Sequence, residues 1–564
     1  MAVSCLGRAV AVVAMAAGGA LAVGCAAPGG LPAARFANAP PVTIVDDRRG
    51  VPTRPDISLP LREVDVYDRS FAGPLFRALE LPTRRRALGV NAVDEVPDST
   101  WFTNRIGVRE LSPAEIARGP LDDDDGAEPP KPWTVRSTWP RGGRLGLLIT
   151  DAHGVAYGIS FDHRDRPELE TGAAIVVNRL LWASGYNVPA DRIAYVRPSE
   201  LVLAPDATIK NELGRMSGLL ERPDLDAMLA EAWQTRDGRI RVHASRRLAG
   251  EPLGGTPPAG TRRGDPNDRI PHQHRRDLRG QYPLFAWLDH VDLVQANFLD
   301  QWITSPRDPA RRYVVHYQLG SGKSLGAMAL TAQFLRSGHS YAFDWGQSGW
   351  SLITLGLAPR PWGRYVAPPL TGVAPTFVPA GFDPGAWRPI LPYAPFDAGD
   401  RFDMFWGTKL LARFTPAQIR AAVEAGQFSD PRAVTYLTNT LIARQRATVA
   451  YWYARVNPLD RFTIAADALC FDDLAIAAGL APAAGTRYEL ASHDRHGNLL
   501  DRAVLTAAAS GPTCTRTLTV SATGDGYTIV EVTTVRPTFA GSTLVHIARA
   551  PDTGTWRVIG VWRR

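Results

Sequence analysis

The change of residue pattern along the chain constrains its fold more than any other feature. Residues 145–161 contain two apolar runs around a turn with Asp and Gly, which predicts a β-hairpin. Residues 172–184 have the composition and end signals of a helix, and residues 193–204 contain two more strand-like runs. Residues 403–455 are mostly helical, and from about residue 470 β-branched runs alternate with Gly-rich turns. We therefore predict an α+β protein with a small α/β lobe, a mainly helical lobe and a small β-rich C-terminal domain.

Length and composition indicate a globular chain of several domains. The 564 residues are 45% hydrophobic and 21% charged, which is usual for folded proteins. Because one domain usually has about 100–200 residues, two or three domains are expected. The predicted divisions are a signal peptide at 1–24, a flexible tether at 25–60, an N-terminal extension at 61–135, a bilobal domain at 136–460 and a β-rich C-terminal domain at 461–564.

The charge of the chain does not indicate a nucleic-acid ligand. The net charge is +7, but arginine supplies nearly all of the positive charge and is scattered along the sequence. Lysine is rare and occurs at Lys131, Lys210, Lys323 and Lys409. High Arg, Ala, Gly and Pro with few Lys is typical of a genomic base-composition bias. No nucleic-acid partner is therefore expected.

The first 25 residues predict export and membrane attachment. Arg8 precedes an uncharged apolar stretch at 9–23, which is the pattern of a secretory signal rather than of a transmembrane helix. Ala, Val and Gly then precede Cys25, an order that resembles a lipobox, in which the cysteine is acylated and becomes the first mature residue. A plain signal peptide cut near Ala26 or Ala27 is the alternative. We expect an exported protein of the cell envelope, anchored to a membrane by a lipid on Cys25.

The other cysteines agree with export. Cys5 would leave with the signal, and Cys470 and Cys514 both lie in the β-rich C-terminal region. Two thiols in one small region of an exported protein predict a disulfide between them. Two buried free thiols are the alternative.

The stretch from His290 to Asn297 is the most informative about chemistry. Asp292 stands five residues before Asn297, which is the spacing of the catalytic loop of kinases. In that chemistry the Asp orients the substrate hydroxyl and the Asn oxygen binds magnesium. The spacing follows the predicted α/β lobe and precedes a strand at 313–317 and a Gly-containing turn. This order of elements is the order of a bilobal kinase fold.

The order and several stretches resemble atypical bacterial kinase-like proteins of the broad HipA-like and spore-coat-kinase-like group. More closely, the chain resembles an uncharacterised family of exported bacterial kinase-like proteins. The resemblance implies a bilobal protein-kinase-like core over residues 136–460. It is carried by Asp94–Arg105, Thr171–Ala173, Gly185–Pro189, Asp265–Asp268, Arg275–Gly280 and Asn457–Asp460.

Three positions depart from what the resemblance implies. Ser160 stands where the phosphate-pairing lysine is expected, and Gly320 takes the place of the metal-binding Asp. Ala174 stands where the helix should carry the Glu that pairs with that lysine. Because a hydroxyl and a glycine cannot replace a cation and a metal ligand, the resemblance implies a domain with impaired catalysis.

Three functions remain open as hypotheses. The first is a kinase-like binding or scaffold module in the envelope, with an unknown envelope protein or glycan as partner and no cofactor. The second is an active atypical phosphotransferase that uses Asp292 as its catalytic residue and Mg-ATP as its cofactor. The residues that would border the Mg-ATP are Asn297, Ser160, Gly320 and Lys323, and Asn297 would bind the magnesium. The third is an envelope protein that binds protein or glycan without kinase ancestry, and stacks sugars on tryptophans such as Trp345, Trp350, Trp362, Trp387 and Trp406.

Two rival motifs are weaker. Gly322, Lys323 and Ser324 after a strand resemble the end of a P-loop, but Tyr317 stands where the motif needs its first Gly. Lys323 is alternatively a displaced cation. A metal site of histidines has little support, because the chain has neither H-E-x-x-H nor C-x-x-C and its candidates are spaced irregularly, at His272, His274, His290 and His316.

Overall fold

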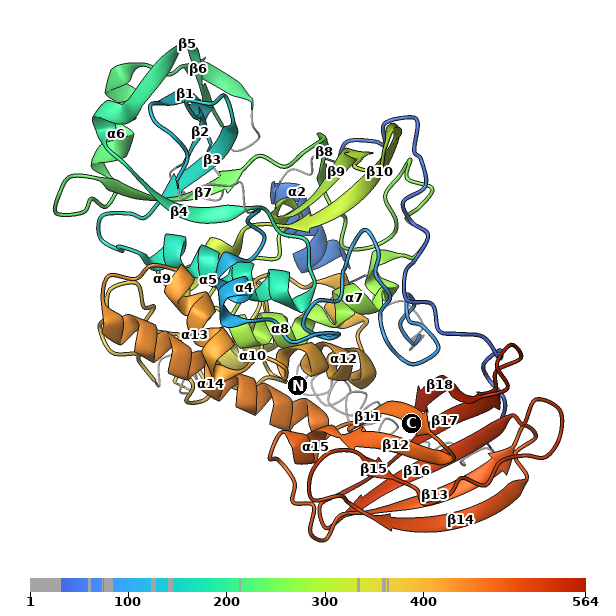
Figure 1. Cartoon of the computed structure of the whole chain (residues 1–564). Coiled ribbons are helices and arrows are strands. Elements are labelled where there is room, and N and C mark those ends of the chain that lie inside the picture. Colours follow the sequence, from blue (N-terminus) through green and yellow to red (C-terminus); the bar gives the residue numbers. More distant parts are fainter. Residues whose placement is uncertain are drawn as a thin grey trace, which may run out of the picture.

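The structure is a computed structural model that describes residues 32–564, apart from residues 59–61, 74, 76–84, 123–127, 140–145, 212–214, 332–334, 358–361 and 363–364. Helix and strand make up about 27% and 28% of the chain, which confirms the predicted mixture of α and β structure. Figure 1 shows a strand-rich part at the top, helices in the middle and a second strand-rich part at the C-terminal end. Cys25 and the predicted signal peptide lie outside the described residues.

The upper sheet has seven strands in the order β4-β7-β3-β2-β1-β5-β6. All neighbouring strands are antiparallel except β1 and β5, which are parallel. The predicted hairpin is present as β2 and β3. The predicted boundary between residues 135 and 136 falls inside β1 and is therefore wrong, because the pairing of β1 makes it part of this sheet. The strands are β1 (Trp133–Thr138), β2 (Gly146–Thr150), β3 (Ala156–Phe161), β4 (Asp191–Val196), β5 (Leu201–Lys210), β6 (Met216–Leu219) and β7 (Ile240–Arg246).

Helix α5 (Leu169–Ser184) is buried along nearly its whole length between the upper sheet and the helical region. It begins at Leu169, slightly before the predicted start. The carboxylate of Asp162 accepts hydrogen bonds from the backbone N–H groups of Glu170 and Thr171, which satisfies free donors of the first turn. Gly185 ends the helix with a φ of 123°, a conformation that favours glycine.

The helical region is built around α8 (Gln281–Leu288), α12 (Arg401–Leu411), α13 (Pro416–Ala425) and α14 (Pro431–Tyr453). Thr415 caps α13, since its hydroxyl accepts from the N–H of Gln418 and Pro416 opens the helix. No helix among the described residues is long and apolar enough to cross a membrane. Shorter helices are α2 (Arg62–Tyr67), η1 (Asp68–Ala72), α4 (Pro113–Arg118), η2 (Pro198–Glu200), α6 (Arg222–Ala230), η3 (His272–His274), α7 (Arg276–Arg279), η4 (Gln295–Asn297), η5 (Ser321–Lys323), α9 (Ala327–Thr331), α10 (Trp345–Ile353) and α11 (Ala394–Asp397).

Three further sheets complete the fold. A three-stranded sheet beside the upper sheet has the order β10-β9-β8, from β8 (Glu251–Gly255), β9 (Phe298–Ser305) and β10 (Asp308–Gln318). The C-terminal domain has a five-stranded antiparallel sheet, β14-β13-β16-β17-β18, and a small sheet, β11-β12-β15. Their elements are β11 (Leu459–Ala465), β12 (Ala468–Asp473), α15 (Leu474–Ala477), β13 (Arg487–Asp494), β14 (Leu499–Thr506), β15 (Thr513–Cys514), β16 (Thr528–Arg536), β17 (Phe539–Arg549) and β18 (Trp556–Arg563).

The C-terminal domain contains a disulfide. Cys470 of β12 and Cys514 of β15 face each other across the small sheet and are bonded. The bond joins two strands of the small sheet and closes a loop that contains β13 and β14 of the large sheet.

The segment predicted to be a flexible tether is held along the surface wherever the structure describes it. Phe36 packs edge-on against His546 of the C-terminal domain, with ring centroids 4.9 Å apart. Ile44 forms a β-bridge with Asp98, and Ser58 forms one with Gly254. Residues 32–58 therefore contact the C-terminal domain, the loop before α4 and the β8 sheet in turn, and the prediction of a free tether is wrong for them.

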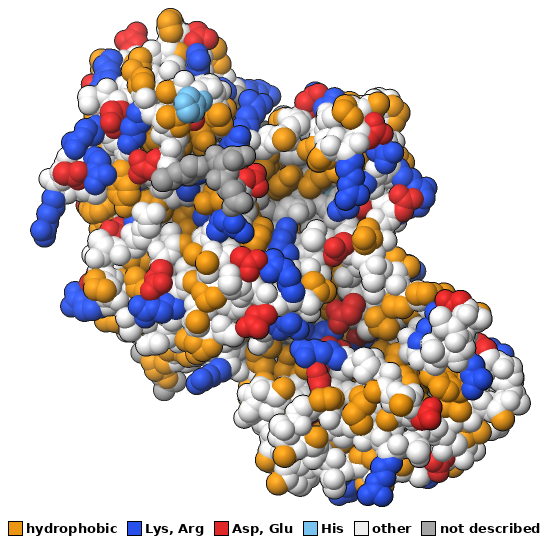
Figure 2. All heavy atoms as spheres, in the orientation of Figure 1, with side chains coloured by type: hydrophobic (Ala, Val, Ile, Leu, Met, Phe, Trp, Pro, Cys, Tyr) orange, Lys and Arg blue, Asp and Glu red, His pale blue; other side chains and the backbone are white. Residues whose placement is uncertain are grey.

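A cluster of buried ion pairs, the junction cluster, joins the C-terminal domain to the helical region. Arg563 of β18 pairs with Asp94 at 2.7 Å and with Asp460 at 2.8 Å. Arg276 of α7 pairs with the same Asp94 at 3.0 Å and with Asp403 of α12 at 2.7 Å. Arg276 and Arg563 hold the pKa of Asp94 below its usual value, although burial opposes this. Figure 2 shows acidic and basic side chains side by side where this domain meets the rest of the molecule.

Candidate functional site

The loop that carries Asp292 connects α8 to β9. α8 ends at Leu288. Asp289, the residue after it, has a left-handed φ of 47°, and residues 290–294 then run without regular structure to η4. The side-chain amide of Asn297 donates to the backbone oxygen of Asp292 at 2.7 Å. This bond closes the loop on itself, so the two residues singled out by their spacing lie against each other.

Arg69 of η1 holds this loop from the N-terminal side. Its buried guanidinium donates to the backbone oxygens of Leu293 at 2.6 Å and of Pro392 at 2.8 Å. Asp65 lies 3.5 Å from Arg69 and also accepts from the backbone N–H of Gln295 at 3.2 Å. The α2–η1 segment is therefore a structural part of the site. No motif in the sequence predicted this, because the contact joins segments more than two hundred residues apart.

Gly320 packs directly against Asn297. The backbone N–H of Leu319 donates to the backbone oxygen of Asn297 at 2.8 Å, which draws the two segments together. Gly320 has a φ of 75°, and a Cβ there would collide with the side-chain amide of Asn297. Both the backbone conformation and the close approach therefore require glycine at this position.

Lys323 completes the group. It lies in η5, which follows Gly320, and its Nζ is 3.6 Å from Oδ2 of Asp292. Both side chains are largely buried. The structure thus brings four of the predicted residues into one cluster, the candidate site: Asp292, Asn297, Gly320 and Lys323.

Ser160 belongs to a different polar group. It is buried in β3, and its hydroxyl lies 3.4 Å from Nδ1 of His243 on the neighbouring β7. Nε2 of His243 is 2.9 Å from Oδ2 of Asp191 on β4. The contacts of Ser160 are thus made within the upper sheet, and they do not bring it to Asp292.

His290 is held neutral beside the candidate site. Its Nδ1 lies 2.7 Å from the hydroxyl of Ser324. Burial lowers the pKa of His290 to about 4, and the nearby charge of Asp292 opposes this shift only in part. The positive charge that faces Asp292 at neutral pH is therefore that of Lys323.

A second buried polar cluster lies under β9 and β10. His316 pairs with Asp300 at 2.6 Å, and Arg262 and Thr256 also contact Asp300. Although burial opposes ionisation, His316 and Arg262 lower the pKa of Asp300 to about 2. Trp101 stacks on the imidazole of His316, with centroids 3.5 Å apart and ring planes within 13°. The imidazole of His316 is thus engaged by buried protein side chains, Asp300 and Trp101.

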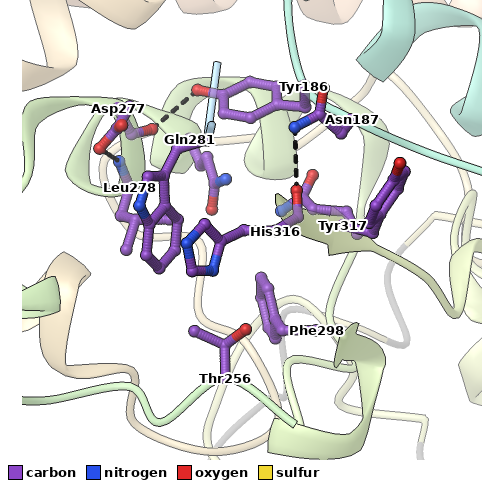
Figure 3. Close-up of a pocket in the computed structure, with 11 residues that line it drawn as sticks. Tyr186, Asn187, Thr256, Asp277, Leu278, Gln281, Phe298, His316 and Tyr317 are labelled. Carbon is purple, nitrogen blue, oxygen red and sulfur yellow. Dashed lines mark hydrogen bonds between the residues drawn. The ribbon is translucent and has the colours of Figure 1, made fainter. Parts of the chain in front are cut away.

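A small cavity opens beside His316, lined also by Tyr186, Asn187 and Asp277 (Figure 3). Its volume is about 20 Å³, close to that of a single water molecule and far below the roughly 300–1,000 Å³ of pockets for organic ligands. Gln281 and Gln318 line it, and Oε1 of Gln281 and both amide atoms of Gln318 have no hydrogen-bond partner among the described residues. A nucleotide does not fit in this cavity.

The histidines do not form a metal site. His272 pairs with Asp268 at 2.7 Å, and Nδ1 of His274 lies 2.9 Å from Arg279. Across the described part of the chain, no group of three or more His, Cys, Asp and Glu side chains is placed to hold a metal ion. At the candidate site, the ammonium group of Lys323 lies beside Asp292 and would repel a metal cation bound there.

Sequence reasoning missed Gln318, the last residue of β10. The strand ends at Gln318, and Leu319 and Gly320 follow before η5. The end of a strand can be predicted from apolar alternation only to within a few residues. The sequence therefore could not show which residue is the last of β10, and Gln318 was not singled out.

Comparisons were made with protein-family models, with curated proteins and with solved structures. None of the three finds a protein or family that this chain matches.

Proposed function

We propose that this chain is an exported, lipid-anchored protein with a kinase-like core of impaired catalysis, which acts as a binding or scaffold module in the cell envelope. The observation that carries the proposal is the meeting of Asp292, Asn297 and Gly320 with the ammonium group of Lys323. In this proposal the Asp292 loop corresponds to a phosphoryl-transfer loop, and a protein cation stands beside its carboxylate.

The stretch around Asp292 supports a kinase-like origin beyond the Asp-to-Asn spacing. His290, Asp292, Leu293 and Asn297 fit four positions of the H-R-D-L-x-x-x-N catalytic loop. A β-hairpin, β9 and β10, follows at once and ends in Gln318-Leu319-Gly320. In this alignment the tripeptide stands for Asp-Phe-Gly, with Gln318 rather than Gly320 at the metal-binding position and Gly320 at the position of the glycine.

The same alignment explains why catalysis would be impaired. An amide at Gln318 is neutral and cannot replace the carboxylate that binds magnesium. Ser160 supplies no cation for the phosphates, and its hydroxyl contacts His243 instead. Lys323 already faces Asp292 at 3.6 Å, so a magnesium ion near Asp292 would meet a positive charge. Losses of this kind typically cost orders of magnitude in rate.

The proposed location agrees with a non-catalytic role. ATP is scarce outside the cytoplasm, so an exported kinase would lack its usual phosphate donor. The partner would be an envelope protein or a glycan, and the membrane would be contacted through the lipid on Cys25.

An active atypical phosphotransferase is the second candidate. It is favoured by one observation, that Asp292 and Asn297 are both kept and lie in contact. In that case Lys323 would turn from Asp292 to the phosphates and supply the cation that Ser160 lacks.

A thermal-shift assay with Mg-ATP separates the two candidates. We expect no rise in the melting temperature of the protein, because a ligand that does not bind cannot stabilise the native state. The double variant Gln318→Asp with Lys323→Met introduces a carboxylate at the proposed metal position and removes the resident cation. Its melting temperature should rise when Mg-ATP is added, and the rise should require magnesium. Its matched control is Asp308→Asn, which alters an acidic side chain at the exposed start of β10.

Activity assays complete the test. Turnover of ATP by the unmodified protein, abolished by Asp292→Ala and kept by Asp308→Asn, would reject the impaired module and support the phosphotransferase. A magnesium-dependent rise in the unmodified protein without turnover would support a nucleotide-binding module instead.

A further inference from the structure

The most exposed apolar surface of the described chain lies on α10 and the turn after it. Leu352, Ile353, Leu355 and Leu357 are 77%, 76%, 82% and 85% exposed. Exposed apolar residues are common singly, but contiguous apolar patches on soluble proteins usually mark a contact with another molecule. We call this surface the apolar face, and its members are Tyr67, Phe343, Trp345, Trp350, Leu352, Ile353, Leu355 and Leu357.

Helix α10 has no buried residue. A helix of nine residues is marginal in water by itself, and helices in proteins are stabilised mainly by packing of an apolar side. Asp344 caps α10 by accepting from the N–H of Gln347 at 2.9 Å, which contributes only part of that stability. The apolar side chains of α10 therefore need an apolar environment that the described chain does not supply.

The apolar face continues onto η1, next to the candidate site. Phe71 contacts Phe343 at 5.0 Å and Trp345 at 5.9 Å between ring centroids, and Tyr67 stacks on Phe71 at 5.8 Å. η1 is also the helix whose Arg69 holds the backbone of the Asp292 loop. Whatever covers the apolar face therefore lies one helix away from that loop.

The chemistry of the apolar face is that of a bilayer interface. The sequence from Trp345 to Leu357 contains no charged residue and combines two tryptophans with four leucines or isoleucines. Exposed Trp together with Leu in and after a short helix is found in segments that lie in the plane of a membrane surface.

The start of the described chain also keeps the molecule close to a membrane. If Cys25 is lipidated, only residues 26–31 separate it from the segment that packs on the C-terminal domain from residue 32. Seven extended residue steps span at most about 24 Å. The folded part is therefore held against the bilayer surface rather than on a long tether.

We propose that the apolar face inserts into the interfacial layer of the bilayer to which the protein is anchored. The inference rests on the lipid anchor of the proposed function, and it adds a second contact that fixes how the molecule lies on the membrane. The candidate site would then lie close to the membrane.

Fluorescent labelling of the full chain tests the inference. Cys5→Ser and Cys25→Ser remove the lipid and leave no free thiol apart from an introduced one, since Cys470 and Cys514 are bonded. An environment-sensitive label at Leu352→Cys should become several-fold brighter with vesicles of phosphatidylethanolamine and phosphatidylglycerol. Lipids with a quencher in the acyl chain should then reduce its signal. The matched control is a label at Val504→Cys, an exposed residue of β14 in the C-terminal domain.

Each outcome decides the inference. A response at position 352 and not at 504 supports it, and Trp345→Ser with Leu355→Ser should then weaken that response several-fold. No response at 352, or equal responses at both positions, overturns it. A response that grows with protein concentration without vesicles overturns it in favour of a second copy of the chain. None of these outcomes depends on nucleotide, so failure here is distinct from failure of the kinase-like proposal.

Discussion

The junction cluster and the candidate site both contain buried charges, but they are built differently. At the junction, Arg563 lies between Asp94 and Asp460, and Arg276 lies between Asp94 and Asp403. Each charge there meets opposite charges from segments far apart in the sequence, within hydrogen-bond distance. At the candidate site, Lys323 of η5 and Asp292 of the loop after α8 are 3.6 Å apart. The junction therefore fixes the architecture, whereas the pair at the candidate site is a weaker local contact.

This difference changes the meaning of the resemblance to kinase-like proteins. Asp94, Arg276 and Asp460 belong to stretches that carry the resemblance, and all three are in the junction cluster. Asp268, from another such stretch, pairs with His272 in the core. The matching stretches therefore supply contacts between segments. Of the positions with chemical roles, Asp292 and Asn297 are kept, whereas those expected to carry the phosphate-pairing lysine and the metal-binding Asp depart.

The largest expected effect is at the junction. Arg563→Ala leaves Asp94 and Asp460 buried without one of their cations, which should lower the free energy of unfolding by about 3–5 kcal/mol. Urea unfolding measures this. Arg432→Ala is the control, because its ion pair with Asp430 is exposed to solvent and should contribute far less to stability. Equal losses in both variants would contradict a structural role for the junction cluster.

The disulfide is expected to have the next largest effect. Cys470→Ala with Cys514→Ala opens a loop with a sequence separation of 44, which should lower the free energy of unfolding by about 3–4 kcal/mol. Since the bond lies inside the C-terminal domain, the contribution of Arg563 should be unchanged in the disulfide-free protein. Alkylation of both thiols in the untreated protein without reductant would show that the bond is absent.

The acid sensitivity of the protein should come from two buried histidines, one beside the candidate site and one in the C-terminal domain. Burial lowers the pKa of His290 to about 4, and burial with the charge of Arg35 lowers that of His546 to about 4. The unfolded state, with a pKa near 6.5, then binds protons first as the pH falls. Each histidine contributes stability that is complete above about pH 6.5 and declines toward pH 4, by at most about 3 kcal/mol.

Unfolding in urea at several pH values between 7.5 and 4 measures this loss. His290→Gln should flatten the pH dependence of the part that contains the candidate site, and His546→Gln that of the C-terminal domain. If neither substitution changes the slope, these histidines are not buried in neutral form.

Local patterns predicted the elements but not the contacts between them. The β2–β3 hairpin, α5, β10 and the cap at Thr415 follow from alternation, helical period and capping chemistry, all of which act over a few residues. β7 was not predicted, because it lies in a polar, Arg-rich stretch that does not have the apolar pattern of a strand. Its Arg241 can be buried because the guanidinium donates hydrogen bonds to α5 and to the segment just after α13. Such pairing over long distances leaves no local pattern.

For the candidate site too, the sequence predicted the local spacing of residues but not the contacts between distant segments. The spacing of Asp292 and Asn297 and the later Gly320 could be read from the sequence, and the structure brings them together. The contact of Ser160 with His243 could not, because His243 lies on a strand about eighty residues later. Arg69 could not be found either, since its role consists of hydrogen bonds to backbone oxygens, which any sequence offers.

The smallest expected effect is the coupling between Lys323 and Asp292, and it tests the comparison most directly. The Nζ-to-Oδ2 distance of 3.6 Å exceeds that of a good hydrogen bond, and 11% of the Asp292 side chain remains exposed. Water can therefore solvate either group when the other is removed, so a double-mutant cycle of Lys323→Met and Asp292→Asn should give a coupling of about 1 kcal/mol or less. The matched cycle of Arg563→Met and Asp460→Asn should give a clearly larger value, because Arg563 also pairs with Asp94 and is almost fully buried. Equal couplings would mean that Lys323 and Asp292 form a structural ion pair like those of the junction cluster. The loop would then be held shut, and removal of Lys323 should unfold it rather than open a place for magnesium.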